Sequence, residues 1–167
     1  MRHPIRSTIR ATMLALLALF ALAACNKQEA PAKAEAAAVA MPKDGDPNAW
    51  QAYANDIVRK NMDGVTNSPF VYFLPAENTA DFQAQYDSQL EKVQSDITRG
   101  ILEGNMLTFI SPASAKMADL VTAVFADVEP NSMKGVKVLF VGQPADGARV
   151  KAAVTPSGVN YVFVEAK

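Results

Sequence analysis

Short apolar runs alternate with longer amphipathic stretches through the last two thirds of the chain. Four runs rich in β-branched, aromatic and aliphatic residues occupy 70–74, 106–110, 136–141 and 159–164. Continuous apolar runs of this length are typical of strands buried on both faces of a parallel sheet. The stretches between them are long enough for the helical crossovers that parallel strands require. The alternation therefore predicts an α/β domain, with about four mostly parallel strands in a three-layer arrangement and helices on both faces.

Amphipathic periodicity places the helices of this domain. A long helix is expected over 79–99, with Asn78 or Thr79 as its N-cap, because apolar residues recur every three or four positions: Phe82, Tyr86, Leu90, Val93 and Ile97. A first helix over 49–63 presents Trp50, Tyr53, Ile57 and Val58 on one face, and Gly64 follows as a candidate C-terminal cap.

A third helix is expected after Ser111 and Pro112, with Ser111 as N-cap and proline at the first helical position. Residues 146–156 fit either a short helix or an antiparallel strand that turns at 156–158. We favour the helix because Ala148, Ala152 and Ala153 form helices better than strands. The resulting order of elements resembles that of small Rossmann-like and flavodoxin-like proteins, and the resemblance extends to element order alone.

The first 25 residues have the pattern of an export signal. Three arginines precede Ala11, an apolar run covers 11–24, and no acidic residue occurs. The sequence Leu22-Ala23-Ala24-Cys25 then resembles the lipobox of bacterial lipoproteins. This resemblance implies that residues 1–24 are removed as a signal peptide and that Cys25 becomes a lipidated N-terminus. Asn26, where Asp would be typical of inner-membrane retention, favours the periplasmic face of the outer membrane.

Residues 25–47 are expected to form the lipidated cysteine and a flexible tether, which leaves one α/β domain over 48–167. The tether sequence is rich in Ala, Pro, Lys and Glu and contains no aromatic residue. With little to bury, it should contribute little to folding. A chain that begins at Asn48 should then be nearly as stable as one that begins at Asn26.

Composition excludes several kinds of chemistry. The one histidine is His3 and the one cysteine is Cys25, so the expected domain contains neither. That excludes Ser-His-Asp and Cys-His catalysis, disulfides, and zinc sites built on His or Cys within the domain. After Cys25 the chain carries 13 basic against 17 acidic residues, which argues against a nucleic-acid partner. No phosphate-binding glycine motif occurs, and we expect no cofactor and no metal site.

The turns that follow the predicted strands contain the candidate ligand residues, because open parallel sheets bind ligands beyond the carboxyl ends of their strands. Glu77 and Asp146 are candidates for a carboxylate pair that performs acid/base chemistry or holds a hard cation. Ser111, Ser114 and nearby Lys116 are candidates for a small-anion site at a helix start. Ordinary helix capping and solvation explain the same residues, and we regard this as the stronger interpretation.

Two hypotheses for function remain. The first is a non-catalytic binding or interaction module that occupies the surface of an envelope protein as an accessory, assembly factor or inhibitor. Its contact face is predicted on the long helix, where Gln85, Gln89, Lys92 and Asp96 share one side, although a merely solvated helix has the same pattern. The second is a periplasmic enzyme that depends on carboxylates or a metal and acts on an envelope substrate. We interpret the aromatic run 70–73 as core.

The lipobox makes a direct prediction. Replacement Cys25→Ser removes the thiol that would be acylated, so labelling with a palmitate analogue and recovery in the membrane fraction should both be lost. Ala24→Gly, which keeps a small residue before the cysteine, should label normally. Continued labelling of the Cys25→Ser protein would contradict the lipoprotein interpretation.

Overall fold

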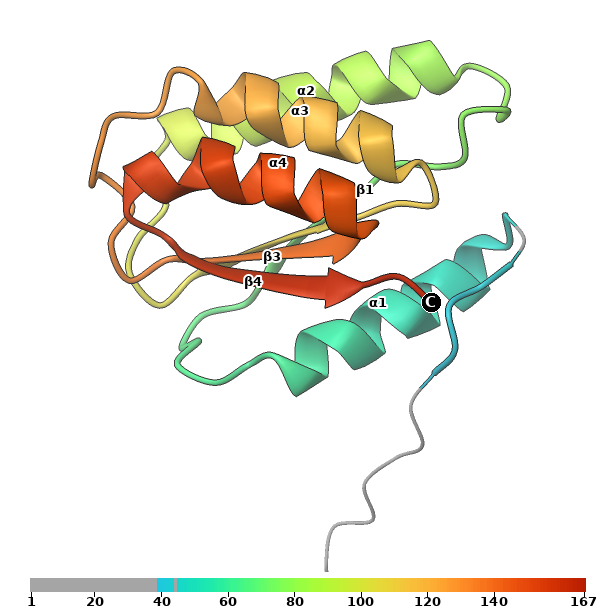
Figure 1. The fold of residues 1–167 in the computed structure, drawn as a ribbon, viewed down its shortest axis with the longest axis horizontal. Helices are drawn as coiled ribbons and strands as arrows, with labels where there is room; N and C mark the ends of the chain where they lie inside the picture. The colour runs from blue at the N-terminus through green and yellow to red at the C-terminus, as the bar shows by residue number, and fades with distance from the viewer. Residues whose placement is uncertain (1–38, 44) are drawn as a thin grey trace, which may run out of the picture. The chain divides into compact units, whose positions relative to one another are not determined.

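The computed structural model describes residues 39–43 and 45–167, which form an α/β domain (Figure 1). The elements alternate along the chain from a first helix to a last strand. The helices are α1 (Pro47–Lys60), α2 (Phe82–Thr98), α3 (Ser114–Phe125) and α4 (Pro144–Val154), with a short 3₁₀ helix η1 (Thr155–Ser157). The strands are β1 (Phe70–Phe73), β2 (Met106–Ile110), β3 (Lys137–Gly142) and β4 (Asn160–Glu165).

The sheet is wholly parallel, and its strands lie in sequence order, β1-β2-β3-β4. The predicted α/β class, the four strands and the helices on both faces are thus confirmed. The segment that fitted either a helix or a strand is the helix α4, as favoured. Because each strand is added on the same side of the one before it, the sheet has no point at which its order reverses.

Helices α2, α3 and α4 lie together on one face, and α1 lies alone on the other (Figure 1). Right-handed crossovers between strands added in one direction all return over the same face. Alternate side chains of each strand then point to opposite layers. Leu107 and Phe109 of β2 pack under α2–α4, whereas Met106 and Ile110 pack with Trp50 of α1.

Three predicted helix ends are wrong. The first helix ends at Lys60, with Asn61 rather than Gly64 as its C-cap, and Gly64 takes its positive φ later, in the loop. Helix α2 begins three residues after the predicted start, behind Asp81, which adopts a left-handed conformation. Ser111 is not the N-cap of α3: its Oγ accepts a hydrogen bond from the Ala113 N–H within a turn, and α3 starts at Ser114.

The prediction that the first strand is buried on both faces is also wrong, since β1 is an edge strand. Tyr72 and Leu74, which face α2–α4, are 1% and 0% exposed, but Val71 on the α1 face is 44% exposed. A single helix about 10 Å wide lies on this face and cannot cover four strands spaced about 4.8 Å apart. The aromatic run is therefore only partly core.

Ordered contacts with the domain begin before Asn48. Asp46 accepts a hydrogen bond from the Asn48 N–H at 3.0 Å and caps α1. Met41 packs against the cluster under α1, and the Val39 N–H donates to Asp56 Oδ2 at 3.3 Å. We call residues 39–43 the strap. The signal segment, Cys25 and most of the expected tether lie outside the described residues.

No helix in the described ranges 39–43 and 45–167 is long and apolar enough to cross a membrane.

The strap makes the start of the chain matter for stability. A chain that begins at Ala38 should melt like one that begins at Asn26, because the strap contacts are kept. A chain that begins at Asn48 loses the Asp46 cap and the Met41 packing, together worth about 2 kcal/mol, and should melt roughly 5–10 °C lower. Equal melting temperatures by circular dichroism for all three would show that the strap contributes nothing.

Candidate functional site

The turns after β2 and β3 meet through one serine and one aspartate. Ser114, the first residue of α3, donates from Oγ to Asp146 Oδ2 at 2.7 Å, and the same Oγ accepts from the Gln143 N–H at 2.9 Å. Asp146 lies in the first turn of α4, where a carboxylate is favoured by the helix dipole. The structure therefore brings two predicted site residues together, in a hydrogen bond that joins the start of α3 to the start of α4.

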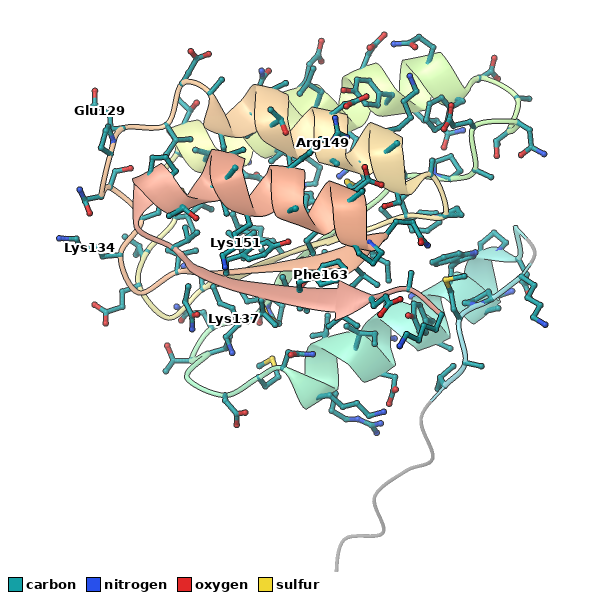
Figure 2. The ribbon with its side chains drawn as sticks, viewed as in Figure 1. Glu129, Lys134, Lys137, Arg149, Lys151 and Phe163 are labelled. Atoms are coloured by element: carbon teal, nitrogen blue, oxygen red, sulfur yellow. The ribbon has the colours of Figure 1, made fainter. Side chains whose placement is uncertain are left out.

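Arg149 extends this network along the outside of the helices. One turn after Asp146, its guanidinium bonds Asp146 Oδ1 at 3.2 Å, Asp119 Oδ1 at 3.0 Å and the Ala115 carbonyl at 3.2 Å. The hydrogen bond from Arg149 to Asp119 and the charges of both carboxylates raise the pKa of Arg149. Figure 2 shows Arg149 on α4 beside α3. The network joins α3 to α4, and it leaves neither oxygen of Asp146 without a partner.

Glu77 does not join this network. It lies exposed in the turn after β1, and no hydrogen bond or ion pair connects it to other described residues. Because β2 separates β1 from β3, the two turns start about 10 Å apart. The predicted pair of Glu77 and Asp146 is not formed. Across the described ranges, no group of three or more His, Cys, Asp or Glu side chains is placed to hold a metal ion.

Asp96 does not belong to an exposed contact face, contrary to the prediction. It is 5% exposed, and it accepts hydrogen bonds from Tyr72 Oη at 3.0 Å, from Lys92 Nζ at 2.9 Å and from Arg99. Burial alone would raise the pKa of Asp96, but hydrogen bonds from Lys92 and Tyr72 outweigh it and hold the pKa below its ordinary value. Burial and donation to Asp96 raise the pKa of Tyr72.

The other members of the predicted face stay at the surface. Gln85 and Lys92 are exposed and Gln89 is half-buried. Lys92 lies over the Tyr72 ring, with Nζ 5.8 Å from its centroid. Since Tyr72 belongs to the edge strand β1, this side of α2 lies next to that edge of the sheet. The face predicted on α2 is thus located beside β1, with Asp96 anchoring it to the strand.

Sequence reasoning missed a groove on the opposite side of β1. It has a volume of about 380 Å³ and is mainly apolar. Its walls come from the first half of α1 and from β1: Pro47, Trp50, Gln51, Ala54, Asn55, Val71 and Phe73. The apolar run of β1 has the same sequence pattern in a central strand as in an edge strand, so no local signal indicated the groove.

Lys137, at the start of β3, is a second residue that sequence reasoning missed. It is 9% exposed, and its Nζ donates to the carbonyls of Asn61 and Asp63 at 2.7 and 2.5 Å. Figure 2 shows Lys137 on the side of the molecule where α1 ends. A cation is favoured beside the carbonyl end of a helix, so Lys137 fixes α1 to the sheet.

Comparison with known proteins adds no assignment: no family model, curated protein or solved structure matches this chain.

The Asp96 cluster predicts a pH dependence of folding. Because the folded-state pKa of Asp96 lies below the unfolded value near 3.9, its stabilisation is present above about pH 4 and is lost as pH falls through the folded value. Asp96→Asn should lower the free energy of unfolding by about 2 kcal/mol at pH 7, and by less as the pH approaches 3. Urea denaturation at several pH values measures this.

The matched control is Asp87→Asn, at an exposed position of the same helix. It should change stability little at any pH. A loss for Asp96→Asn that stays constant from pH 7 to pH 3 would contradict the assigned role of the ionised carboxylate.

Proposed function

We propose that this protein is a lipid-anchored module on the periplasmic face of the bacterial outer membrane that works by binding an envelope protein rather than by catalysis. The observation that carries this proposal is a contrast between two regions of the surface, the turns after β2 and β3 and the groove beside β1. The polar side chains after β2 and β3 bond one another, whereas β1 borders an apolar groove with Val71 left 44% exposed.

The Ser114 network supports a structural role for the residues that were candidates for catalysis. A nucleophilic serine needs a base able to take its proton. Here Ser114 donates to Asp146, but the other oxygen of that carboxylate accepts from Arg149, and Ser114 Oγ is itself held by the Gln143 N–H. The arrangement ties the start of α3 to the start of α4, and it explains why these residue types occur there.

The anchor supports action close to the membrane. If Cys25 is acylated, each buried CH₂ of its lipids contributes about 0.8 kcal/mol, so two or three chains would hold the protein there durably. Residues 26–38 then separate the lipid from the strap. Thirteen residues of flexible chain have a root-mean-square reach of about 20 Å. The domain would sample proteins within a short distance of the membrane.

Capture from the envelope tests the proposal. The full chain, with a C-terminal tag, is crosslinked in cells that express it and is recovered after detergent extraction. We expect one or a few stoichiometric envelope proteins. The double variant Glu77→Gln, Asp146→Asn should capture the same proteins, although it should melt at a lower temperature because Asp146 joins α3 to α4.

The control is the Cys25→Ser chain, which should lose capture if the anchor brings the partners together. Recovery of no specific partner would contradict the proposal. Turnover of an envelope substrate by the wild type, abolished in the double variant at unchanged folded fraction, would favour the enzyme instead.

A further inference from the structure

The free edge of β1 presents backbone groups at two positions. The Leu74 N–H donates to the Ile110 carbonyl of β2. In a parallel ladder, alternate residues of a strand bond the same neighbour, so Phe70, Tyr72 and Leu74 face β2. The N–H and C=O groups of Val71 and Phe73 therefore point away from the sheet. Within the described ranges no strand pairs with this edge.

A proline lies at each end of this edge strand. Pro69 and Pro75 have the same parity as Val71 and Phe73, so their nitrogens also lie on the outer side of the strand, where they have no hydrogen to donate. Proline is one of the devices that keep edge strands from open-ended pairing. Here the two prolines leave a ladder of two residues, with two donors and two acceptors between them.

The side chains of the same two residues open into the groove beside α1. Val71 and Phe73 line it from the strand, and Trp50 and Ala54 line it from the helix. A strand added beside β1 would direct every second side chain to this face of the sheet. The side chains that enter the groove would have to be apolar, because the groove is mainly apolar. Its polar lining residues, Gln51 and Asn55, are uncharged.

The other side of the edge is positively charged. Lys92 and Arg99 are 57% and 70% exposed and share one buried carboxylate, Asp96, so the cluster has one positive charge in excess. Asp96 is already occupied by three donors. The alternate side chains of an added strand would meet this side of α2, and an acidic side chain there complements the charge.

The protein's own N-terminal segment does not suit this groove. On the helical wheel of α1, Asp56 projects from the flank opposite to Gln51 and Asn55. The strap contacts Asp56 through Val39, so the strap lies on the far flank from the groove. Residues 26–38 also contain no aromatic or β-branched residue to fill an apolar groove.

A second copy does not fit either. Packed helices lie 8–10 Å apart, whereas strands lie about 4.8 Å apart. Three packed helices are therefore wider than four strands, and α2 packs on β1 at the edge of the sheet. In an antiparallel pairing of two β1 edges, both α2 helices would lie on the same face and crowd each other. A two-residue ladder would also bury far less than the ~1,200 Å² of a stable dimer.

We propose that the free edge of β1 binds an extended polypeptide segment of another protein as a fifth strand, with apolar side chains in the α1 groove alternating with acidic side chains beside Lys92 and Arg99. This inference rests on the proposed function and names the partner's chemistry. Helix α2 and the α1 groove bound the added strand on its two faces. Backbone bonds supply the pairing, and the alternate side chains supply the selectivity.

A synthetic peptide tests the inference on the full chain in detergent. The probe is a fluorescein-labelled heptapeptide with Val and Glu alternating, and its binding is followed by fluorescence anisotropy. The Val71 and Phe73 amides should become protected from hydrogen exchange when it binds. A peptide with Lys in place of each Glu should bind at least about tenfold more weakly at low salt.

Variant Val71→Pro removes one outward N–H without removing a bond to β2, and it should weaken probe binding by about tenfold. Val71→Thr keeps that N–H and a β-branched side chain, so it should bind within about threefold of the wild type. Lys92→Gln should weaken binding of the acidic probe and flatten its salt dependence. Should Val71→Pro fail to fold, the exchange protection and Lys92→Gln still decide the matter.

Absence of probe binding, or binding that leaves the Val71 and Phe73 amides unprotected, would overturn the inference. Its failure is distinguishable from failure of the proposed function. If the full chain captures an envelope protein and Val71→Pro captures it equally, the protein binds elsewhere and only this inference falls. If capture fails while the probe binds at the edge, the edge assignment stands and the proposed envelope function falls.

Discussion

The one-directional order of the strands is the constraint on which the rest of this structure depends. Parallel strands need crossovers, and right-handed crossovers between strands added in one direction all lie on one face. Three helices therefore crowd one face, and the other is left to α1. One helix and the strap cannot cover four strands, so the β1 side of that face stays open. The groove at Trp50 and Val71 is a consequence of topology.

Each helix beside this edge contains a buried carboxylate that several donors satisfy, and the carboxylate of α2 also bonds the sheet. Asp56 of α1 is 4% exposed and bonds Arg59, Lys60 and the strap, while Asp96 of α2 bonds Lys92, Arg99 and Tyr72. A buried carboxylate is tolerated when its hydrogen-bonding capacity is filled. With α2 held to β1 through Tyr72 and α1 held to β3 through Lys137, the edge between the helices has fixed walls, and a binding strand would order little of the protein.

Local pattern was enough to predict most strands and helices, because burial imposes a period on the sequence. Helix α4 was predicted instead from the helix propensity of Ala148, Ala152 and Ala153. The helix starts at Ser111 and Asn78 were wrong, because several nearby residues can cap and the turn geometry decides among them. The bond from Ser114 to Asp146 joins positions 32 residues apart, and the burial of Asp96 depends on Tyr72, 24 residues earlier. Neither pairing leaves a local signal. The exposure of Val71 follows from the lateral order of the strands, which periodicity does not encode.

The central claim is that the edge of β1 is where this protein meets its partner. Amide hydrogen exchange of the full chain measures it most directly, with the protein compared in isolated envelope membranes and in detergent after purification. The account predicts that the Val71 and Phe73 amides exchange slowly in the envelope and rapidly in detergent, while Tyr72, bonded within the sheet, is protected in both. Equal, rapid exchange of Val71 and Phe73 in both settings would contradict the account.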